Sequence, residues 1–174
     1  MKSIFGALAL CVLFFGTSVK AKEPKHLGTF GDWSAYQTTE NGEKACYMLS
    51  FPKKEEGNYT KRGRVYLLIT HRPASKTFNV ASFHAGYGFK NGQEVTVQIL
   101  GRKKKDSFTL FTEGETAWAP DASTDKAIAT GLSQWGNSLV VHGVSARGTK
   151  TKDTYSLRGS LKAFKAISKA CGVR

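Results

Sequence analysis

The sequence predicts a mainly β fold: an antiparallel β-sandwich or barrel-like single domain with one short helix and a C-terminal helix clasped by a disulfide. Three observations lead to this fold class. Short runs rich in β-branched and aromatic residues recur along the chain, and Gly, Asn and charged turns separate them. Two segments show the apolar spacing of a helix. No internal repeat, low-complexity segment or linker divides the chain.

The N-terminus has the pattern of a secretory signal peptide. Lys2 precedes an apolar run over residues 4–15, and Val19 and Ala21 occupy the small-residue positions that a signal peptidase reads. The run is too short to span a bilayer, which takes about 20 apolar residues. We therefore predict a signal peptide over residues 1–21.

The mature protein is then a single exported domain over residues 22–174, periplasmic or secreted and associated with the outer surface. No later stretch is long and apolar enough to be a transmembrane segment. A lipoprotein anchored at Cys11 is the weaker interpretation, because Leu10 stands where a small residue is needed.

The strand-like runs follow in order through the mature chain. In the run 94–100, Val95, Val97 and Ile99 alternate with Thr96, Gln98 and Leu100. This alternation predicts one buried face and one face partly exposed to solvent. The predicted strands are 31–37, 45–51, 64–71, 78–85, 94–100, 107–111 and 137–145, with a further short strand that ends at Leu157.

Turn residues connect these strands. Asn-Gly pairs at 41–42 and 91–92 supply the positive φ of tight turns, and the glycines of 86–92 are interpreted as serving a hairpin. The polar, charged stretch 53–61 is the best candidate for a mobile loop.

The first predicted helix runs from about Ser123 to Leu132. Asp121 and Asp125 suit its start, because carboxylates are favourable at a helix N-terminus. Ile128 and Leu132 then fall four residues apart on one face.

The second predicted helix starts at Ser160, a candidate N-cap, and ends at Cys171. Its apolar positions are spaced by three and four residues, so they lie on one face and turn the final cysteine toward the sheet. This stripe consists of Leu161, Phe164, Ile167 and Cys171.

Removal of the signal peptide leaves Cys46 and Cys171 as the two mature cysteines. Disulfides form and persist in the compartments that exported proteins reach, and two cysteines allow one pairing. We therefore predict a Cys46–Cys171 disulfide that clasps the last helix to the N-terminal part of the fold. The alternative is a pair of buried free thiols.

Several short motifs run in order through nearly the whole mature chain. They are GDW with Trp33, ACYMLS with Cys46, THRP with Arg72, AGYGF with Tyr87, TAWA with Trp118, SARGT from Ser145, DTYSL from Asp153, Gly159, and the closing helix with Cys171. In these the chain resembles the invasion-associated locus B family, exported bacterial proteins named for a role in host-cell entry. The resemblance implies a host-associated, non-enzymatic protein without a cofactor. Many members carry further cysteines, so extra bridges are not carried over.

Motifs of known enzyme classes are missing. The stretch 143–148 misses the nucleophile elbow G-x-S-x-G by one residue and is interpreted as a turn. His71, His84 and His142 stand on separate strands without the short spacing of metal ligands. We therefore expect neither catalytic residues nor a metal site.

The charge predicts the class of partner. The mature chain keeps 24 basic against 13 acidic residues, a net charge of +11, which favours anionic surfaces. Export makes nucleic acid an improbable partner, whereas lipopolysaccharide, lipid head groups or glycosaminoglycan fit the compartment. The candidate polyanion-binding residues are Arg102, Lys103, Lys104 and Lys105 at an expected hairpin tip, and Lys162, Lys165 and Lys169 on the last helix. The simpler alternative is that these cations only keep the protein soluble.

Together these observations favour an exported, non-enzymatic protein that binds a cell-envelope or host-surface component and contributes to host-cell interaction. A structural protein of the envelope is the first alternative, since basicity suits either role. A periplasmic hydrolase with an unrecognised site is the second.

Overall fold

An 11-stranded antiparallel β-sheet with two α-helices forms the protein in the computed structural model, which describes residues 23–173. The predicted mainly β fold class is confirmed. The predicted signal peptide at 1–21 and Cys11 lie outside the described residues. The strands are β1 Lys25–Phe30, β2 Trp33–Glu40, β3 Glu43–Ser50, β4 Lys54–Gly57, β5 Tyr66–Arg72, β6 Thr77–His84, β7 Val95–Leu100, β8 Lys105–Glu113, β9 Thr116–Trp118, β10 Ser138–Val144 and β11 Lys150–Ser156. The helices are α1 Ala122–Thr130, its π-helical continuation η1 Gly131–Trp135, and α2 Ser160–Cys171.

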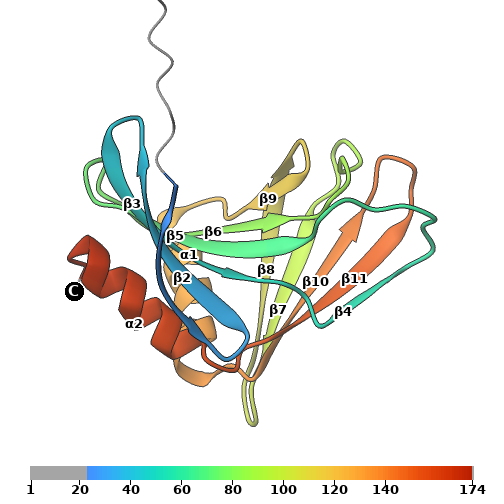
Figure 1. The fold of residues 1–174 in the computed structure, drawn as a ribbon. Helices are drawn as coiled ribbons and strands as arrows, with labels where there is room; N and C mark the ends of the chain where they lie inside the picture. Colours follow the sequence, from blue (N-terminus) through green and yellow to red (C-terminus); the bar gives the residue numbers. More distant parts are fainter. Residues whose placement is uncertain (1–22, 174) are drawn as a thin grey trace, which may run out of the picture.

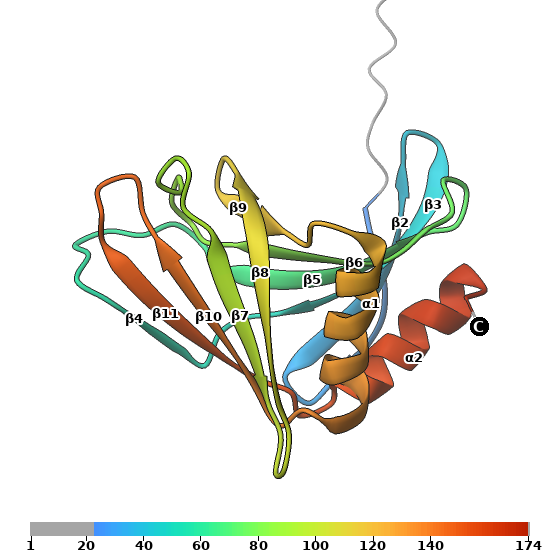
Figure 2. The same ribbon diagram turned by 180° about the vertical axis from the view of Figure 1, so that it is seen from behind.

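The sheet is bent into two halves. Its strand order is β1-β2-β3-β5-β6-β9-β8-β7-β10-β11-β4. The long strand β8 pairs with β9 on one side and with β7 on the other, so it joins the halves. Figures 1 and 2 show β2, β3, β5 and β6 in one half and β7, β10, β11 and β4 in the other, with α2 against β2 and β3 and α1 beside β6.

The hydrophobic core fills the space between the halves and under the helices. Alternation places Val95, Val97 and Ile99 of β7 at 0 % exposure, as the sequence pattern predicts. The same core contains Trp33, Met48, Leu67, Ile69, Leu110, Ile128, Leu132, Leu139, Tyr155, Ala163 and Ile167. No helix of residues 23–173 is long and apolar enough to cross a membrane.

The two predicted Asn-Gly turns have different surroundings. Asn41 and Gly42 have φ of 51° and 84° between Glu40 and Glu43, which is the tight hairpin predicted for β2 and β3. Gly92 also has positive φ, at 72°. The hairpin expected over 86–92 is wrong, because this segment connects β6 to β7 and these strands are not neighbours in the sheet.

Three strands were not predicted, namely β1, β4 and β9. The most instructive is β4, which lies inside the expected mobile loop 53–61 and pairs with β11. That expectation is corrected for residues 54–57, which form an edge strand. A four-residue run of Lys, Glu, Glu and Gly shows no alternation of apolar residues, so its hydrogen bonds to a distant strand leave no local pattern.

The first helix begins as predicted and ends later. The Asp121 carboxylate accepts a hydrogen bond from the Thr124 amide at 2.8 Å, so Asp121 is the N-cap. Asp125 does more than begin the helix: it is buried and accepts a hydrogen bond from the Ala81 amide at 2.8 Å. Burial raises the pKa of Asp125. The helical segment continues as η1 to Trp135 and passes the predicted end at Leu132.

The predicted start of α2 needs correction, although its end at Cys171 is confirmed. The N-cap is Gly159 with φ of 96°, where any side chain would collide with the Phe30 carbonyl oxygen. The Ser160 hydroxyl lies within hydrogen-bond distance of the carbonyl oxygens of Leu132 and Leu157 instead of capping the helix.

The buried face of α2 also differs from the predicted apolar stripe. Leu161 is 44 % exposed and Phe164 is half-buried. The residues of α2 that are buried are Ser160, Ala163, Ile167 and Cys171. Small side chains at Ser160 and Ala163 let the start of the helix pack closely and leave Leu161 outside. Phe164 is partly buried against the core, with its ring centre 5.5 Å from that of His71.

The predicted disulfide is confirmed, and the two free thiols are excluded. Cys46 of β3 and Cys171 at the end of α2 form a bond of 2.06 Å with their Cα atoms 6.0 Å apart. His71 lies opposite Cys46 in the sheet and is fully buried beneath α2, where its ring accepts a hydrogen bond from the Asn79 amide at 3.1 Å. Burial lowers the pKa of His71 to about 4.

Candidate functional site

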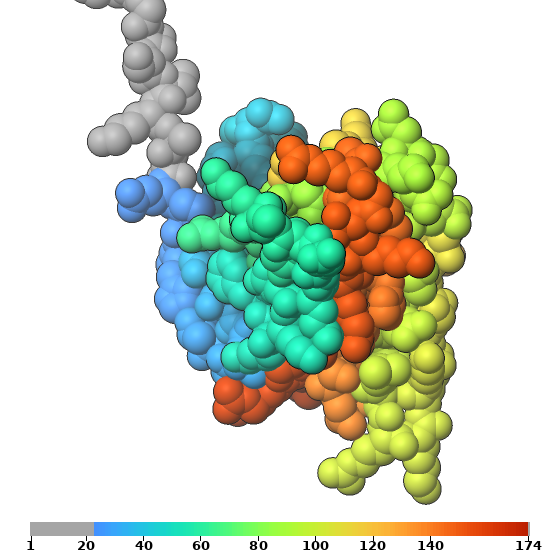
Figure 3. Space-filling view, turned by 90° about the vertical axis from the view of Figure 1, so that its right-hand side faces the viewer, coloured from blue at the N-terminus to red at the C-terminus, as the bar shows by residue number. Residues whose placement is uncertain are grey.

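A cleft of about 640 Å³ opens where four connecting segments meet. They are the connection between β4 and β5 with residues 58–63, the start of the β6–β7 connection with 86–88, Glu115, and the β10–β11 turn with 145–149. Figure 3 shows the segment before β5 lying against the β10–β11 hairpin. Two of the motifs that carry the family resemblance, AGYGF and SARGT, thus contribute to one concave surface.

A buried ion pair holds the walls of this cleft together. Both guanidinium ends of Arg62 bond to the Asp153 carboxylate at 2.7 Å, and the two side chains are 3 % and 4 % exposed. The Arg62 Nε donates to the Ala85 carbonyl at 2.7 Å. Burial alone would lower the pKa of Arg62, but the bonds to Asp153 raise it above its ordinary value. Arg62 therefore ties the β4–β5 connection to the segment that follows β6 and to β11.

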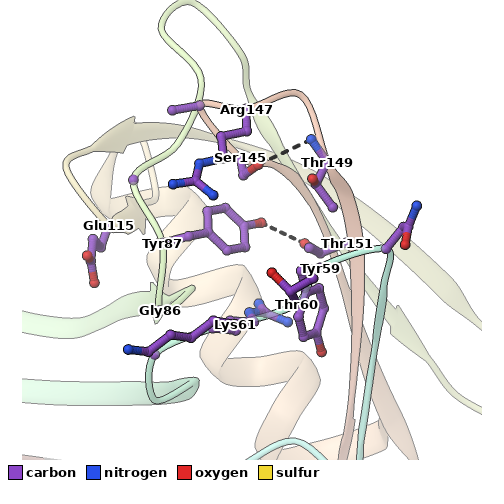
Figure 4. Close-up of a pocket in the computed structure, with 15 residues that line it drawn as sticks. Tyr59, Thr60, Lys61, Gly86, Tyr87, Glu115, Ser145, Arg147, Thr149 and Thr151 are labelled. Carbon is purple, nitrogen blue, oxygen red and sulfur yellow. Dashed lines mark hydrogen bonds between the residues drawn. The ribbon is translucent and has the colours of Figure 1, made fainter.

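Two tyrosine rings flank the same guanidinium. The Arg62 Cζ lies 5.4 Å from the centre of the Tyr59 ring and 5.0 Å from that of Tyr87. The Tyr87 hydroxyl and the Thr151 hydroxyl are 2.6 Å apart, and Figure 4 shows these side chains pointing toward each other. Burial raises the pKa of Tyr87. The cleft thus has fixed aromatic walls.

The turn after β10 forms the upper wall of the cleft in Figure 4. The Ser145 hydroxyl accepts a hydrogen bond from the Thr149 amide at 3.2 Å, and the Gly148 amide bonds to the Ser145 carbonyl at 2.7 Å. This confirms the predicted turn. The Ala146 amide bonds to the Gly88 carbonyl at 2.8 Å and fastens the turn to the β6–β7 connection.

The rim of the cleft carries two cations and one carboxylate. Lys61 and Arg147 are exposed and form no ion pair within residues 23–173. Figure 4 shows them on opposite sides of the hydrogen bond between Tyr87 and Thr151. The Glu115 carboxylate lies 3.2 Å from the His84 ring. With two cations against one carboxylate, the rim carries a net positive charge.

A second concave surface, the helix groove, lies between α1–η1 and α2 and has a volume of about 570 Å³. Leu161, Phe164 and Val173 give it an apolar floor. Lys126 of α1 and Lys165 and Lys169 of α2 line it as well. None of the three lysines forms an ion pair in the described part of the chain.

The basic residues singled out in the sequence fall into two unlike places. On α2, Lys162, Lys165 and Lys169 are all exposed, and the last two line the helix groove. Arg102, Lys103 and Lys104 occupy the tip of the predicted β7–β8 hairpin, with Lys105 as the first residue of β8. At this tip the Lys104 ammonium lies 2.9 Å from Asp106 and 4.5 Å from the centre of the Trp135 ring. The hairpin tip lines neither the cleft nor the helix groove.

Other motif residues have structural roles. Trp33 is fully buried, and its indole donates to the Ser156 carbonyl at 3.0 Å, which connects the two halves of the sheet. Arg72 pairs with Glu40 at 2.7 Å near the β2–β3 turn. Within residues 23–173 no three His, Cys, Asp or Glu side chains gather as ligands for a metal ion.

Sequence reasoning missed the central residues of the cleft. No role was assigned to Arg62 from the sequence, and nothing local in the sequence indicates that it pairs with Asp153, which is 91 residues away. One signal in the sequence was Gly86 of the AGYGF motif. It packs so closely on Gly63 that an added Cβ would lie 2.5 Å from the Gly63 carbonyl oxygen.

Comparisons with known proteins agree with this architecture. The sequence model of the invasion associated locus B (IalB) protein family matches residues 33–168. The crystal structure of invasion associated protein B from Bartonella henselae superposes with a TM-score of 0.50 and 20 % identity, over 82 % of this chain and 97 % of that chain. This likeness concerns the fold. A search of curated proteins found no match.

Proposed function

The chain belongs to the invasion-associated locus B family, and from this membership we propose that it is an exported, non-enzymatic protein that binds an anionic lipid of the cell envelope or of a host surface and so contributes to interaction with a host cell. The single observation that carries the proposal is the helix groove, where three lysines that form no ion pair within residues 23–173 lie beside apolar side chains.

The floor of the helix groove supports an acyl chain as part of the ligand. Leu161 is 44 % exposed and Phe164 is half-buried, so both leave apolar surface in water. Phe78, on β6 beside the groove residue Asn79, is 37 % exposed. Covering such surface with hydrocarbon is favourable because it removes apolar area from water.

The walls of the helix groove support a phosphate-bearing head group. Lys126, Lys165 and Lys169 line it together, and its lining contains no acidic residue. Each lysine near an anionic membrane surface contributes about 1 kcal/mol to binding at physiological salt. The combination of ammonium groups and apolar floor fits an amphiphile better than it fits a polyanion without acyl chains.

The hairpin tip supports this function less well. Its Lys104 is already occupied by Asp106 and the Trp135 ring, so that cation is less available to a ligand. The hairpin tip therefore serves as the matched control for the helix groove.

The test is co-sedimentation with vesicles of phosphatidylglycerol, with phosphatidylcholine vesicles as the uncharged reference. Two triple variants of equal net charge are compared: the helix triple, with Lys126, Lys165 and Lys169 of the helix groove changed to Glu, and the hairpin triple, with Arg102, Lys103 and Lys105 changed to Glu. The helix triple should lower affinity by about tenfold or more, whereas the hairpin triple should have a smaller effect.

Two results would contradict the proposal. Equal losses of affinity in the two triple variants would show that binding depends on overall charge and not on the helix groove. Equal binding of the parent protein to both kinds of vesicle would exclude recognition of the anionic head group. Vesicles that contain lipopolysaccharide or phosphatidylserine then distinguish an envelope lipid from a host-type lipid.

A further inference from the structure

The cleft at the opposite end of the molecule is a second site whose walls are preformed. The Arg62 guanidinium donates hydrogen bonds to both Asp153 carboxylate oxygens and to the Ala85 carbonyl, and its side chain is 3 % exposed, so it is engaged within the fold. Its role is to fix three wall segments relative to each other. A cleft whose walls are already ordered binds without a large loss of conformational entropy.

The aromatic walls supply apolar surface on the sides of the two tyrosine rings that Arg62 does not cover. Tyr59 and Tyr87 are both half-buried and line the cleft. The C–H face of a pyranose ring is apolar with slightly positive hydrogens, which matches the negative face of an aromatic ring. The cleft is also within the size range of small-molecule sites, since it measures about 640 Å³.

The remaining lining supplies groups that both donate and accept hydrogen bonds. Asn58, Thr60 and Thr149 line the cleft and carry an amide or hydroxyl group. Each sugar hydroxyl is likewise a donor and an acceptor, so this lining matches a saccharide.

The positive charge of the rim favours a ligand that carries an acidic group. Lys61 and Arg147 line the cleft without an ion pair in the described residues, whereas Glu115, the acid of the lining, lies beside His84. The Arg147 guanidinium can bond a carboxylate with two parallel N–H groups.

From this lining we propose that the cleft binds an acidic saccharide, a short oligosaccharide with a carboxylate on at least one ring. The pyranose faces pack on Tyr59 and Tyr87, and the carboxylate pairs with Lys61 or Arg147. The site is independent of the helix groove, because the two concave surfaces share no lining residue.

The test uses a hyaluronan tetrasaccharide, which carries carboxylates and no sulfate, and neutral chitotetraose as the reference. In amide NMR spectra the hyaluronan fragment should shift residues 58–63, 86–88 and 145–149, and chitotetraose should bind about tenfold more weakly or not at all. Shifts confined to the groove residues of α1 and α2, or equal binding of the two sugars, would overturn the proposal.

Variants sharpen this result. Lys61→Gln with Arg147→Gln should weaken hyaluronan binding by about tenfold or more, whereas Lys162→Gln with Lys165→Gln, which removes the same charge, should leave it nearly unchanged. Tyr59→Phe should retain binding and Tyr59→Ala should lose it. If the double variant at Lys61 and Arg147 and the double variant at Lys162 and Lys165 lose hyaluronan binding equally, the binding is general charge attraction and the proposed site is wrong.

An acidic sugar can come from either side of a host contact. A 2-keto-acid oligosaccharide released from lipopolysaccharide represents the bacterial envelope, and the hyaluronan fragment represents host uronic acids. Tighter binding of one of them identifies the source, and failure of both contradicts the proposal. These sugars carry no acyl chain, so their failure leaves the vesicle result at the helix groove unaffected.

Discussion

The cleft and the helix groove are built by opposite means. Regular helices line the groove, and α2 is anchored by its buried face and by the disulfide from Cys171 to Cys46. Connecting segments line much of the cleft, and their anchor is the buried pair of Arg62 and Asp153. Connecting segments lack a continuous hydrogen-bond ladder of their own. Here a charged side chain with several hydrogen-bond donors anchors them, whereas a helix is anchored by the packing of its buried face.

Breaking the ion pair should produce the largest effect on stability. Arg62→Met leaves the Asp153 carboxylate buried and unpaired, which should lower the free energy of unfolding by about 3–5 kcal/mol. Urea unfolding measures this change. The double variant Arg62→Met with Asp153→Leu should recover much of the loss, and a single variant as stable as the parent would show that the pair does not anchor the cleft.

Removing the disulfide should have the second-largest effect on stability, and this effect should be concentrated in α2 and the helix groove. Cys46→Ala with Cys171→Ala should lower stability by about 2–5 kcal/mol, since the bond closes a loop with a sequence separation of 125 residues. Amide hydrogen exchange should then increase in α2 more than around Tyr87. Uniform acceleration in both regions would contradict the division into two separately anchored sites.

Acid should weaken the α2 side through His71. Its pKa is about 4 in the fold against an ordinary 6.5, because burial disfavours the charged ring. The unfolded chain therefore binds more protons between these values, so this contribution is fully present above about pH 6.5 and is lost as pH falls toward 4.

The loss should reach at most about 3 kcal/mol, measured as the change in urea stability between neutral and acidic pH. His71→Gln has no such titration, and its stability should fall less over the same range. If parent and variant lose the same stability, the pH dependence comes from other groups.

The sequence predicted elements whose signal is local. The strand β7 was found because Val95, Val97 and Ile99 alternate, and the β2–β3 turn because Asn41 and Gly42 tolerate positive φ. The strand β4 was missed because it pairs with β11, far along the chain. The strands β1 and β9 pair with their chain neighbours β2 and β8, but their short runs show no apolar alternation. The buried face of α2 was predicted correctly at Ile167 and Cys171, but at the start of the helix the small residues Ser160 and Ala163 are buried in place of Leu161.

The sites divide in the same way. Lys165 and Lys169 were named as candidate binding residues on the last helix, whereas Lys126, which lines the same groove from another helix, was not. The fold of the sheet brings together Arg62, Asp153 and the two tyrosines. Because they come from distant parts of the chain, no local sequence pattern indicates that they meet. The family resemblance pointed to Tyr87 and Ser145 without assigning them a common site.

The open ends of the sheet have a consequence for the behaviour of the protein at high concentration. The terminal strand β4 has only four residues, and its Lys54, Glu55 and Glu56 are all charged. At the other end, the pairing of β1 with β2 shifts between His26 and Gly28. A strand from another molecule would have to bury these charges at one end or match an irregular register at the other. Both ends therefore resist edge-to-edge aggregation, which protects a sheet that never closes on itself.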